Sequence, residues 1–378
     1  MFILSNIMDK EINIGHELNK ILDNAYDEAI SVEDANYLMN LNGRGLFNLF
    51  SVADTVREEN VGNNVTFINN CNINFTNICT VRCGFCAFGR DEGDEDAYIL
   101  SDDEILMKAG PAVRRGAREF TLMGGVLKDA DIEYYEHLLG LLKTNFKGIS
   151  IHGFSPTMVH DAAKLSGISL EDAFIRLKDA GLDTLPGTAA EILNDRPRNI
   201  ICPQKVSTEE WIDVIKVAHN AGIQGSATMM YGHVETLEER VEHLDILRKI
   251  QMETGGFTEF IPMTFIHENS PVFLEGQEGL GATGIEDLKL YAVARLMFRD
   301  LIPNIQVSWV KMGFRFAQVA LMCGANDLGG TLGGDELSEA SGTPDGADTS
   351  IANLSKIAKA IGRNPIERNS NYTEFYEI

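Results

Sequence analysis

The pattern of hydrophobic and polar positions changes once along the chain, near residue 60. Residues 1–60 carry apolar side chains at helical spacing and no obvious strand, with Ser31 and Asp34 as a possible helix-capping pair. From about Val65 onward, short β-rich segments alternate with helical ones. This pattern predicts an N-terminal helical extension over residues 1–60, followed by a domain of repeated strand–helix units.

Eight segments have the composition of strands: VTFINNCNINFT, EFTLMG, GISIHGF, LDTLPG, GSATMMYG, FTEFIPMTF, IQVSWV and ALMCGAND. The segments between them begin with helix-capping signals, which are Ser101 with Glu104, Ser169 with Asp172, Ser207 with Glu210, Thr236 with Glu239, and Thr283 with Glu286. Repeated units of this kind imply parallel strands with helices packed outside. Eight units favour an α/β fold of the (βα)8 TIM-barrel type, with a doubly wound open sheet as the alternative.

The last part of the chain closes this domain. We expect the barrel domain to span residues 61–342, and a C-terminal helix and tail to span residues 343–378. The Gly-rich stretch GGTLGGDELSEASGTPDGADTS follows the last strand candidate. We expect it to form either a mobile loop over one barrel mouth or an ordinary surface loop.

Charge and composition narrow the class of protein. The 378 residues include 32 basic and 56 acidic ones, a net charge of −24 that argues against a nucleic-acid binder or a binder of anionic membrane surfaces. No apolar stretch approaches the roughly 20 residues that span a bilayer, and the first residues lack the basic region of a signal peptide. We therefore expect a cytoplasmic protein, in which clustered thiols bind metal or do chemistry.

Three of the six cysteines lie within eight residues, as Cys79, Cys83 and Cys86 in the order C-x-x-x-C-x-x-C. A structural zinc site usually needs a fourth ligand, and no second cysteine pair follows. A thioredoxin-like motif would leave Cys79 unused. A [4Fe-4S] cluster fits better, because three thiolates on one loop can hold three irons and leave the fourth iron open.

This loop, with Phe85 before the last cysteine, resembles the signature of the radical S-adenosylmethionine (SAM) superfamily. The resemblance implies that Cys79, Cys83 and Cys86 hold one cluster and that SAM chelates the open iron. It further implies that SAM is bound by Phe85 in the same loop and by residues that follow other strands, namely Gly124, Gly125, Glu191 and Tyr231. The alternatives are a plain turn for the glycine pair and a solvated residue at a helix start for Glu191.

A longer resemblance runs from about Asn69 to Gly342. The stretches INFTNICTVRCGFCAF, PGTAAEIL, MMYGHVETLEERVEHL and CGANDLGGT are similar to the CofH family. That family transfers the 4-hydroxybenzyl group of L-tyrosine to 5-amino-6-(D-ribitylamino)uracil, in biosynthesis of the deazaflavin chromophore (FO) of coenzyme F(420). The resemblance implies a second radical SAM subunit of the CofG type and an electron donor as partners.

Two other interpretations stay open at this point. One is a radical SAM enzyme of the menaquinone pathway, related to MqnE or MqnC, because the shared motifs mostly serve the cluster and SAM. The other is a non-catalytic iron–sulfur subunit that supports a second radical SAM protein. Cys71 stands where the resemblance leads us to expect a basic residue, so the contacts of that position are in doubt.

Polar residues after the strand candidates are the candidate substrate contacts. We expect His233 and Glu235 to be catalytic, and His152, Asn326 and Asp327 to contact substrate, because the functional residues of such barrels lie at the carboxyl ends of strands. The alternatives without a functional role are a structural histidine at a strand end for His152 and a turn-forming pair for Asn326 and Asp327.

Overall fold

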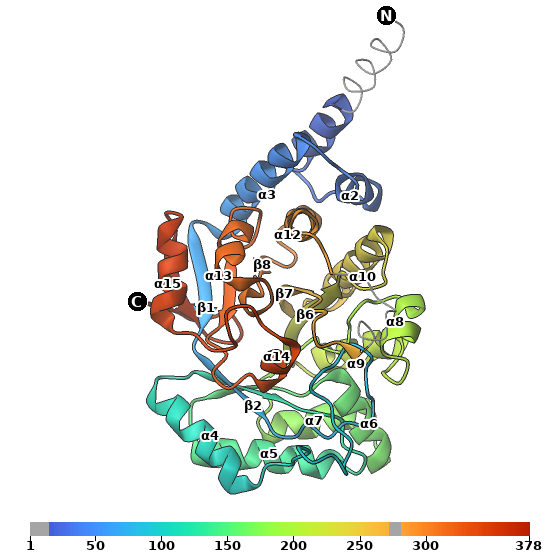
Figure 1. Cartoon of the computed structure of the whole chain (residues 1–378), viewed down its shortest axis with the longest axis vertical. Coiled ribbons are helices and arrows are strands. Elements are labelled where there is room, and N and C mark those ends of the chain that lie inside the picture. The colour runs from blue at the N-terminus through green and yellow to red at the C-terminus, as the bar shows by residue number, and fades with distance from the viewer. Residues whose placement is uncertain (1–14, 272–280) are drawn as a thin grey trace, which may run out of the picture.

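The computed structural model describes residues 15–271 and 281–378. Helices and strands alternate along most of the chain (Figure 1). In chain order the elements are α2 (Val32–Met39), α3 (Gly45–Val61), β1 (Asn64–Ile68), β2 (Asn70–Asn74), α4 (Asp102–Arg114), β3 (Glu119–Met123), α5 (Ile132–Asn145), β4 (Ser150–Gly153), α6 (Pro156–Ser166), α7 (Leu170–Ala180), β5 (Thr184–Leu185), α8 (Asp195–Ile201), α9 (Thr208–Asn220), β6 (Gln224–Tyr231), α10 (Leu237–Thr254), β7 (Phe257–Thr264), α12 (Gly284–Phe298), β8 (Asn304–Ile305), α13 (Trp309–Ala320), β9 (Asp327–Gly330), α14 (Glu336–Ser341), α15 (Ile351–Ala360), β10 (Asn364–Arg368) and β11 (Phe375–Glu377).

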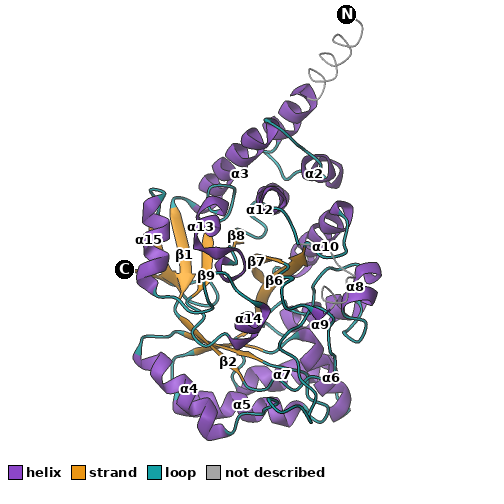
Figure 2. Ribbon diagram, in the orientation of Figure 1, coloured by secondary structure: helices purple, strands orange, loops and turns teal. Residues whose placement is uncertain are grey.

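Seven parallel strands form the main sheet, in the order β2-β3-β4-β5-β6-β7-β8. Two isolated parallel bridges extend it into a ring: Gln306 pairs with Asp327 at the start of β9, and Cys71 pairs with Gly333 just after β9. Helices lie outside the strands (Figure 2). The expected α/β architecture of the TIM-barrel type is therefore confirmed.

A second sheet, of order β11-β10-β1-β9, lies beside the closure of the ring. The segment predicted as a single first strand is in fact two: β1 pairs with β10 and β9, whereas β2 pairs with β3. The region predicted as a C-terminal helix and tail holds α15 and also the strands β10 and β11. Sequence patterns missed β10 because its partner β1 is far away in the chain, and missed β11 because it has only three residues.

The eighth strand was predicted too early. ALMCGAND (320–327) instead covers the end of α13 and a turn, and β9 begins only at its last residue. A short apolar run does not distinguish a strand from a buried helix end by periodicity alone. The Gly-rich stretch that follows was expected to be a loop, but it contains the short helix α14.

The five predicted helix caps are all present. Ser101, Ser207, Thr236 and Thr283 each accept the N3 backbone N–H in a complete capping box, and Ser169 accepts the N–H of Asp172. These caps fix where α4, α7, α9, α10 and α12 begin, and so how the preceding loops leave the sheet.

The N-terminal helices α2 and α3 pack at one end of the molecule, against α10 and α12 (Figure 1). The Lys289 ammonium in α12 donates to the carbonyl of Met39, at 2.6 Å. Within the described residues, no helix combines the length and the apolar character that crossing a bilayer requires.

Candidate active site

A cavity of about 360 Å³ runs through the interior of the barrel. Alternate side chains of four strands line it, as expected for residues that share one face of a strand. In β3, β6 and β7 these side chains change from polar at the strand start to methionine near the strand end, and β2 presents asparagines throughout. The lining side chains of these strands are Asn70, Asn72 and Asn74; Glu119, Thr121 and Met123; Ser226, Thr228 and Met230; and Glu259, Ile261 and Met263.

The loop after β2 brings the three clustered cysteines to the wall of this cavity. We call residues 75–90 the cysteine loop. Cys79, Cys83 and Cys86 all line the cavity, and all are free thiols. The backbone N–H of Val126 points at the Cys79 sulfur, 3.4 Å away. Burial raises the pKa of the Cys83 thiol.

The glycine pair after β3 packs directly against this loop. The Gly125 N–H donates to the carbonyl of Thr76 at 2.9 Å. A Cβ on Gly125 would lie 2.0 Å from the Ile78 carbonyl oxygen and 2.8 Å from the Cys79 Cβ, and one on Gly124 would lie 2.9 Å from the Thr76 oxygen. Both glycines line the cavity. Glycine is therefore required here because the two backbones are in contact.

The cysteines fit an iron–sulfur cluster better than a single metal ion. Across residues 15–271 and 281–378, no three His, Cys, Asp or Glu side chains converge to hold one ion. Thiolates that hold a [4Fe-4S] cluster bind different irons, so they surround the cluster without converging on a point. Three free thiols on one cavity wall, with a backbone N–H directed at one sulfur, meet that requirement.

Glu191 lies on the same wall, in the turn after β5. It is 7% exposed and forms an ion pair with Lys205, whose ammonium also lies 5.2 Å from the centre of the Phe85 ring. All three residues line the cavity. The Glu191 backbone has a φ of 45°, and its carbonyl accepts the N–H of Met230 at 2.7 Å. This backbone hydrogen bond holds the turn that carries Glu191 against the end of β6.

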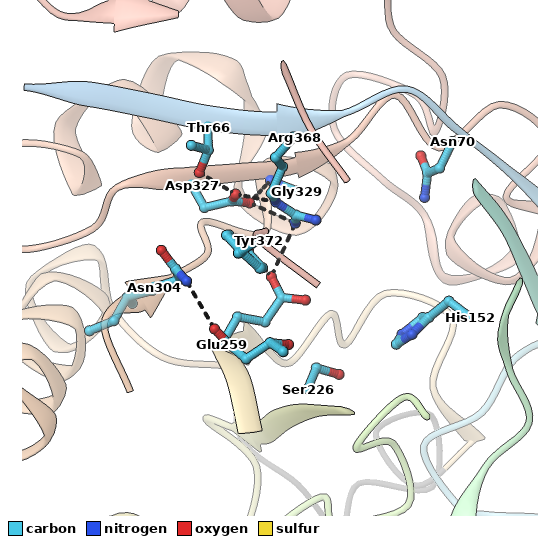
Figure 3. Close-up of polar contacts among 12 residues, drawn as sticks. Thr66, Asn70, His152, Ser226, Glu259, Asn304, Asp327, Gly329, Arg368 and Tyr372 are labelled. Carbon is cyan, nitrogen blue, oxygen red and sulfur yellow. Dashed lines mark hydrogen bonds and ion pairs between the residues drawn. The ribbon is translucent and has the colours of Figure 1, made fainter. Parts of the chain in front are cut away.

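A buried cluster of ion pairs lies deeper, near the starts of β7 and β9. We call Thr66, Glu259, Asp327, Arg368 and Tyr372 the arginine cluster (Figure 3). Arg368 Nε lies 2.7 Å from the Asp327 carboxylate, and its Nη2 lies 3.2 Å from that of Glu259. The Thr66 hydroxyl donates to Asp327 at 2.6 Å, and the Tyr372 hydroxyl donates to Glu259. Burial and the nearby Asp327 charge raise the pKa of Glu259 to about 7, although Arg368 opposes the shift.

His152 lies across the cavity from this cluster, as Figure 3 shows. Its Nδ1 is 2.8 Å from the hydroxyl of Thr184, which also lines the cavity. Burial lowers the pKa of His152, so the imidazole is neutral near pH 7. Because Nδ1 is bonded to Thr184, the Nε2 atom is left to donate or accept one hydrogen bond with a bound molecule, depending on the tautomer.

Several predicted site residues lie off the cavity wall. Tyr231 is fully buried, and its hydroxyl donates to Asp287 at 2.7 Å.

Glu235 accepts the N–H groups of Gly232 and His233, at 2.6 and 2.9 Å, and pairs with Arg240. His233 is held by the backbone, with Nε2 3.0 Å from the carbonyl of Met230 and Nδ1 accepting the Val234 N–H. Such contacts are those of a structural turn, and a catalytic role for His233 and Glu235 stays a prediction.

The Asn–Asp pair has a similar structural position. The Asn326 amide accepts hydrogen bonds from Arg295 and from the N–H of Ile305, at 2.8 and 2.9 Å. Asp327 belongs to the arginine cluster, where its carboxylate accepts hydrogen bonds from Arg368 and orients it. Neither residue lines the cavity, but Arg368 does. Direct substrate contact by Asn326 and Asp327 also stays a prediction.

Sequence reasoning missed most of the polar lining. Glu259, Ser226 and Thr228 were visible as polar residues at alternate positions in otherwise apolar strands, a pattern of a polar barrel interior. Arg368 had no such signal. Glycines in β9 make room for the lining, since a Cβ on Gly330 would lie 2.1 Å from the Asn70 side chain.

Comparisons with known proteins agree with this geometry. The chain matches the family model described as Radical SAM superfamily over residues 73–247, and the one described as CofH/MqnC C-terminal region over residues 254–378. It is 49% identical to the 5-amino-6-(D-ribitylamino)uracil–L-tyrosine 4-hydroxyphenyl transferase of Methanothermobacter thermautotrophicus, covering 97% of this chain and 100% of that protein. A Methanosarcina barkeri protein of the same name is 47% identical, covering 93% and 90%.

Solved structures share the fold at low identity. The crystal structure of methylornithine synthase (PylB) matches with a TM-score of 0.71 and 20% identity, covering 92% of this chain and 96% of that one. The FeFe-hydrogenase maturase HydG from Carboxydothermus hydrogenoformans matches with a TM-score of 0.74 and 17% identity, covering 97% and 82%.

The barrel and its cysteine loop define the class: this is a radical SAM protein, and that class uses a [4Fe-4S] cluster and SAM. Within the class, the chain belongs to the CofH family of 5-amino-6-(D-ribitylamino)uracil–L-tyrosine 4-hydroxyphenyl transferases.

Proposed function

We propose that this protein cleaves L-tyrosine and transfers its 4-hydroxybenzyl group to 5-amino-6-(D-ribitylamino)uracil, the reaction for which its relatives are named. The observation that carries the proposal is one cavity that joins the three cysteines to a polar barrel interior. Five buried polar atoms on the wall of that cavity have no hydrogen-bond partner in the described residues: Asn72 Oδ1, Asn74 Nδ2, Thr157 Oγ1, Thr188 Oγ1 and Ser370 Oγ.

Unpartnered buried polar atoms cost stability unless a ligand or water satisfies them. A ribityl chain presents several hydroxyl groups, and a diaminouracil presents both donors and acceptors. Such a molecule suits the interior formed by Asn70, Asn72, His152 and Ser226 better than an apolar one would. The neutral His152 and the hydroxyl-rich strands let this part of the cavity bind a neutral polar molecule.

The residues of the cysteine loop, and those beside it on the cavity wall, have a separate role. We infer that Cys79, Cys83 and Cys86 hold one [4Fe-4S] cluster, with SAM at the open iron. When bound, the cluster and SAM supply a 5′-deoxyadenosyl radical. Glu191, held by Lys205, offers a carboxylate to the amino or ribose groups of SAM, beside Phe85 and the Gly124–Gly125 backbone. The enclosed barrel interior keeps water and other reductants from the reacting groups.

Two further features belong to this proposal. One cluster motif occurs in the sequence, so closing the ring of the finished deazaflavin needs a second radical SAM subunit of the CofG type. An electron donor must also reduce the cluster. We expect the protein, the second subunit and the electron donor to be in the cytoplasm, where thiols stay reduced.

Product analysis under anaerobic conditions tests the function. The reduced, cluster-loaded protein, given SAM, tyrosine and the diaminouracil, should make 5′-deoxyadenosine, methionine and an adduct that joins the 4-hydroxybenzyl group to the uracil. The remaining two-carbon fragment should be released as an imine that hydrolyses to glyoxylate. Conversion of dehypoxanthine futalosine or an enolpyruvyl benzoate, with no adduct from tyrosine, would contradict the proposal. A protein that made no 5′-deoxyadenosine would instead be a non-catalytic subunit.

A further inference from the structure

The cavity wall carries three cations, and one of them has no carboxylate partner in the described part of the chain. Lys205 pairs with Glu191, and Arg368 pairs with Asp327 and Glu259. Lys311, in the first turn of α13, lines the same cavity. Its ammonium makes no hydrogen bond or ion pair with residues 15–271 or 281–378. An ammonium on the wall of a cavity is costly to leave without a partner once the cavity excludes water, so a site of this kind favours a bound anion.

A carboxylate lies on the same wall without pairing with this lysine. Asp335 caps the N-terminus of α14, is 7% exposed and lines the cavity. One of its oxygens accepts the N–H of Ser338 at 3.2 Å. Burial lowers the pKa of Lys311, and the charges of Asp335 and Cys86 oppose this shift. The cavity wall thus carries one positive and one negative group that do not pair with each other.

Opposite charges that share a wall but do not pair match a zwitterion. Of the two molecules joined in the proposed reaction, the diaminouracil carries no charge, whereas tyrosine carries an α-carboxylate and an α-ammonium. We propose that Lys311 binds the α-carboxylate of L-tyrosine and that Asp335 binds its α-ammonium. This inference rests on the proposed function. It places the amino-acid end of tyrosine at the part of the wall that carries Lys311 and Asp335, and leaves the polar barrel interior to the uracil.

SAM is also an α-amino acid, so the experiment must separate the two ligands. Binding is measured on the cluster-loaded protein without reductant, so that no turnover occurs. The ligands are SAM, L-tyrosine, tyramine, which lacks the carboxylate, and 3-(4-hydroxyphenyl)propanoate, which lacks the ammonium. The proteins are wild type, Lys311→Met, Asp335→Asn and the control Lys356→Met, which changes an exposed lysine of α15.

The expected pattern is selective. Wild type and Lys356→Met should bind tyrosine about 10- to 100-fold more tightly than either analogue, the range for one charge-assisted hydrogen bond. Lys311→Met should lose the preference over tyramine, and Asp335→Asn should lose the preference over the propanoate. The affinity for SAM and the iron content should stay at the wild-type level in both variants.

Three results would overturn the inference alone. Lys311→Met could weaken SAM binding instead, which would assign this lysine to the carboxylate of SAM. It could weaken tyrosine and tyramine equally, which would indicate a structural role. It could keep the full preference for tyrosine, which would indicate a solvated side chain. A wild-type protein that bound no tyrosine would overturn the proposed function as well, so the two failures are distinguishable.

Discussion

The cysteine loop lines the cavity, and the arginine cluster reaches the same cavity through Glu259 and Arg368, but the two regions are built in different ways. The cysteine loop is one continuous segment, residues 75–90, and it packs against the glycine pair after β3 through backbone contacts. The arginine cluster joins β1, β7, β9, β10 and the turn after β10 through side-chain ion pairs and hydrogen bonds. The end of the cavity at the cysteine loop therefore depends on backbone shape, whereas the deep end depends on charge balance between distant segments.

The largest effect should come from removing a thiol from the cysteine loop. Cys83→Ala should lose the cluster and all production of 5′-deoxyadenosine while the protein stays folded, because the fold does not depend on the thiol. Iron and sulfide content, with circular dichroism for the fold, measures this. Cys202→Ala, a buried cysteine that does not line the cavity, is the control and should keep its iron. Full iron and sulfide in Cys83→Ala would show that this thiol is not a ligand.

A change in backbone shape alone should also damage this end. Gly125→Ala places a Cβ 2.0 Å from the Ile78 oxygen, so the cysteine loop must move and cluster loading should fall by an order of magnitude or more. Gly140→Ala in α5 is the matched control, since nothing lies within 4 Å of its Cβ, and alanine should stabilise that helix by about 0.5 to 1 kcal/mol. Normal iron content in Gly125→Ala would mean that the loop tolerates the shift.

The cysteine loop could be predicted from the sequence alone, and the arginine cluster could not. The cysteine loop and the helix caps were predictable because each depends on residues close together in the chain. The glycine pair was predictable because it resembles a motif of the superfamily, although it packs against Thr76 and Ile78, far away in the chain. Arg368 was not, since its partners Asp327 and Glu259 are 41 and 109 residues away. His233 and Glu235 were predicted as functional from their place after a strand, yet their contacts are with neighbouring backbone and Arg240. Position at a strand end does not say which way a side chain points.

Removing the cation from the arginine cluster tests the other half of the comparison. Arg368→Met leaves Asp327 and Glu259 buried without their shared partner and should lower the free energy of unfolding by about 3 to 5 kcal/mol. Urea unfolding measures the loss. Arg118→Met, which breaks a partly exposed pair with Glu367, should cost only about 1 kcal/mol. Iron bound per folded molecule should stay normal in Arg368→Met, and loss of the cluster there would show that the two regions are coupled.

The smallest effect, and the one most specific to the arginine cluster, is a dependence of stability on pH. Burial and the Asp327 charge raise the pKa of Glu259 from 4.5 to about 7. Between these values the folded protein holds a proton that the unfolded chain has released, so the contribution of Glu259 to stability falls as pH rises through this window.

Glu259→Gln removes the titration. The difference in unfolding free energy between wild type and Glu259→Gln should therefore shrink or reverse by up to about 3 kcal/mol from pH 4.5 to 7. Glu209→Gln, which changes an exposed glutamate of α9, is the matched control. If the Glu259→Gln difference did not vary with pH, or if it grew as pH rose, Arg368 would hold Glu259 ionised throughout, and the deep end of the cavity would carry a fixed charge.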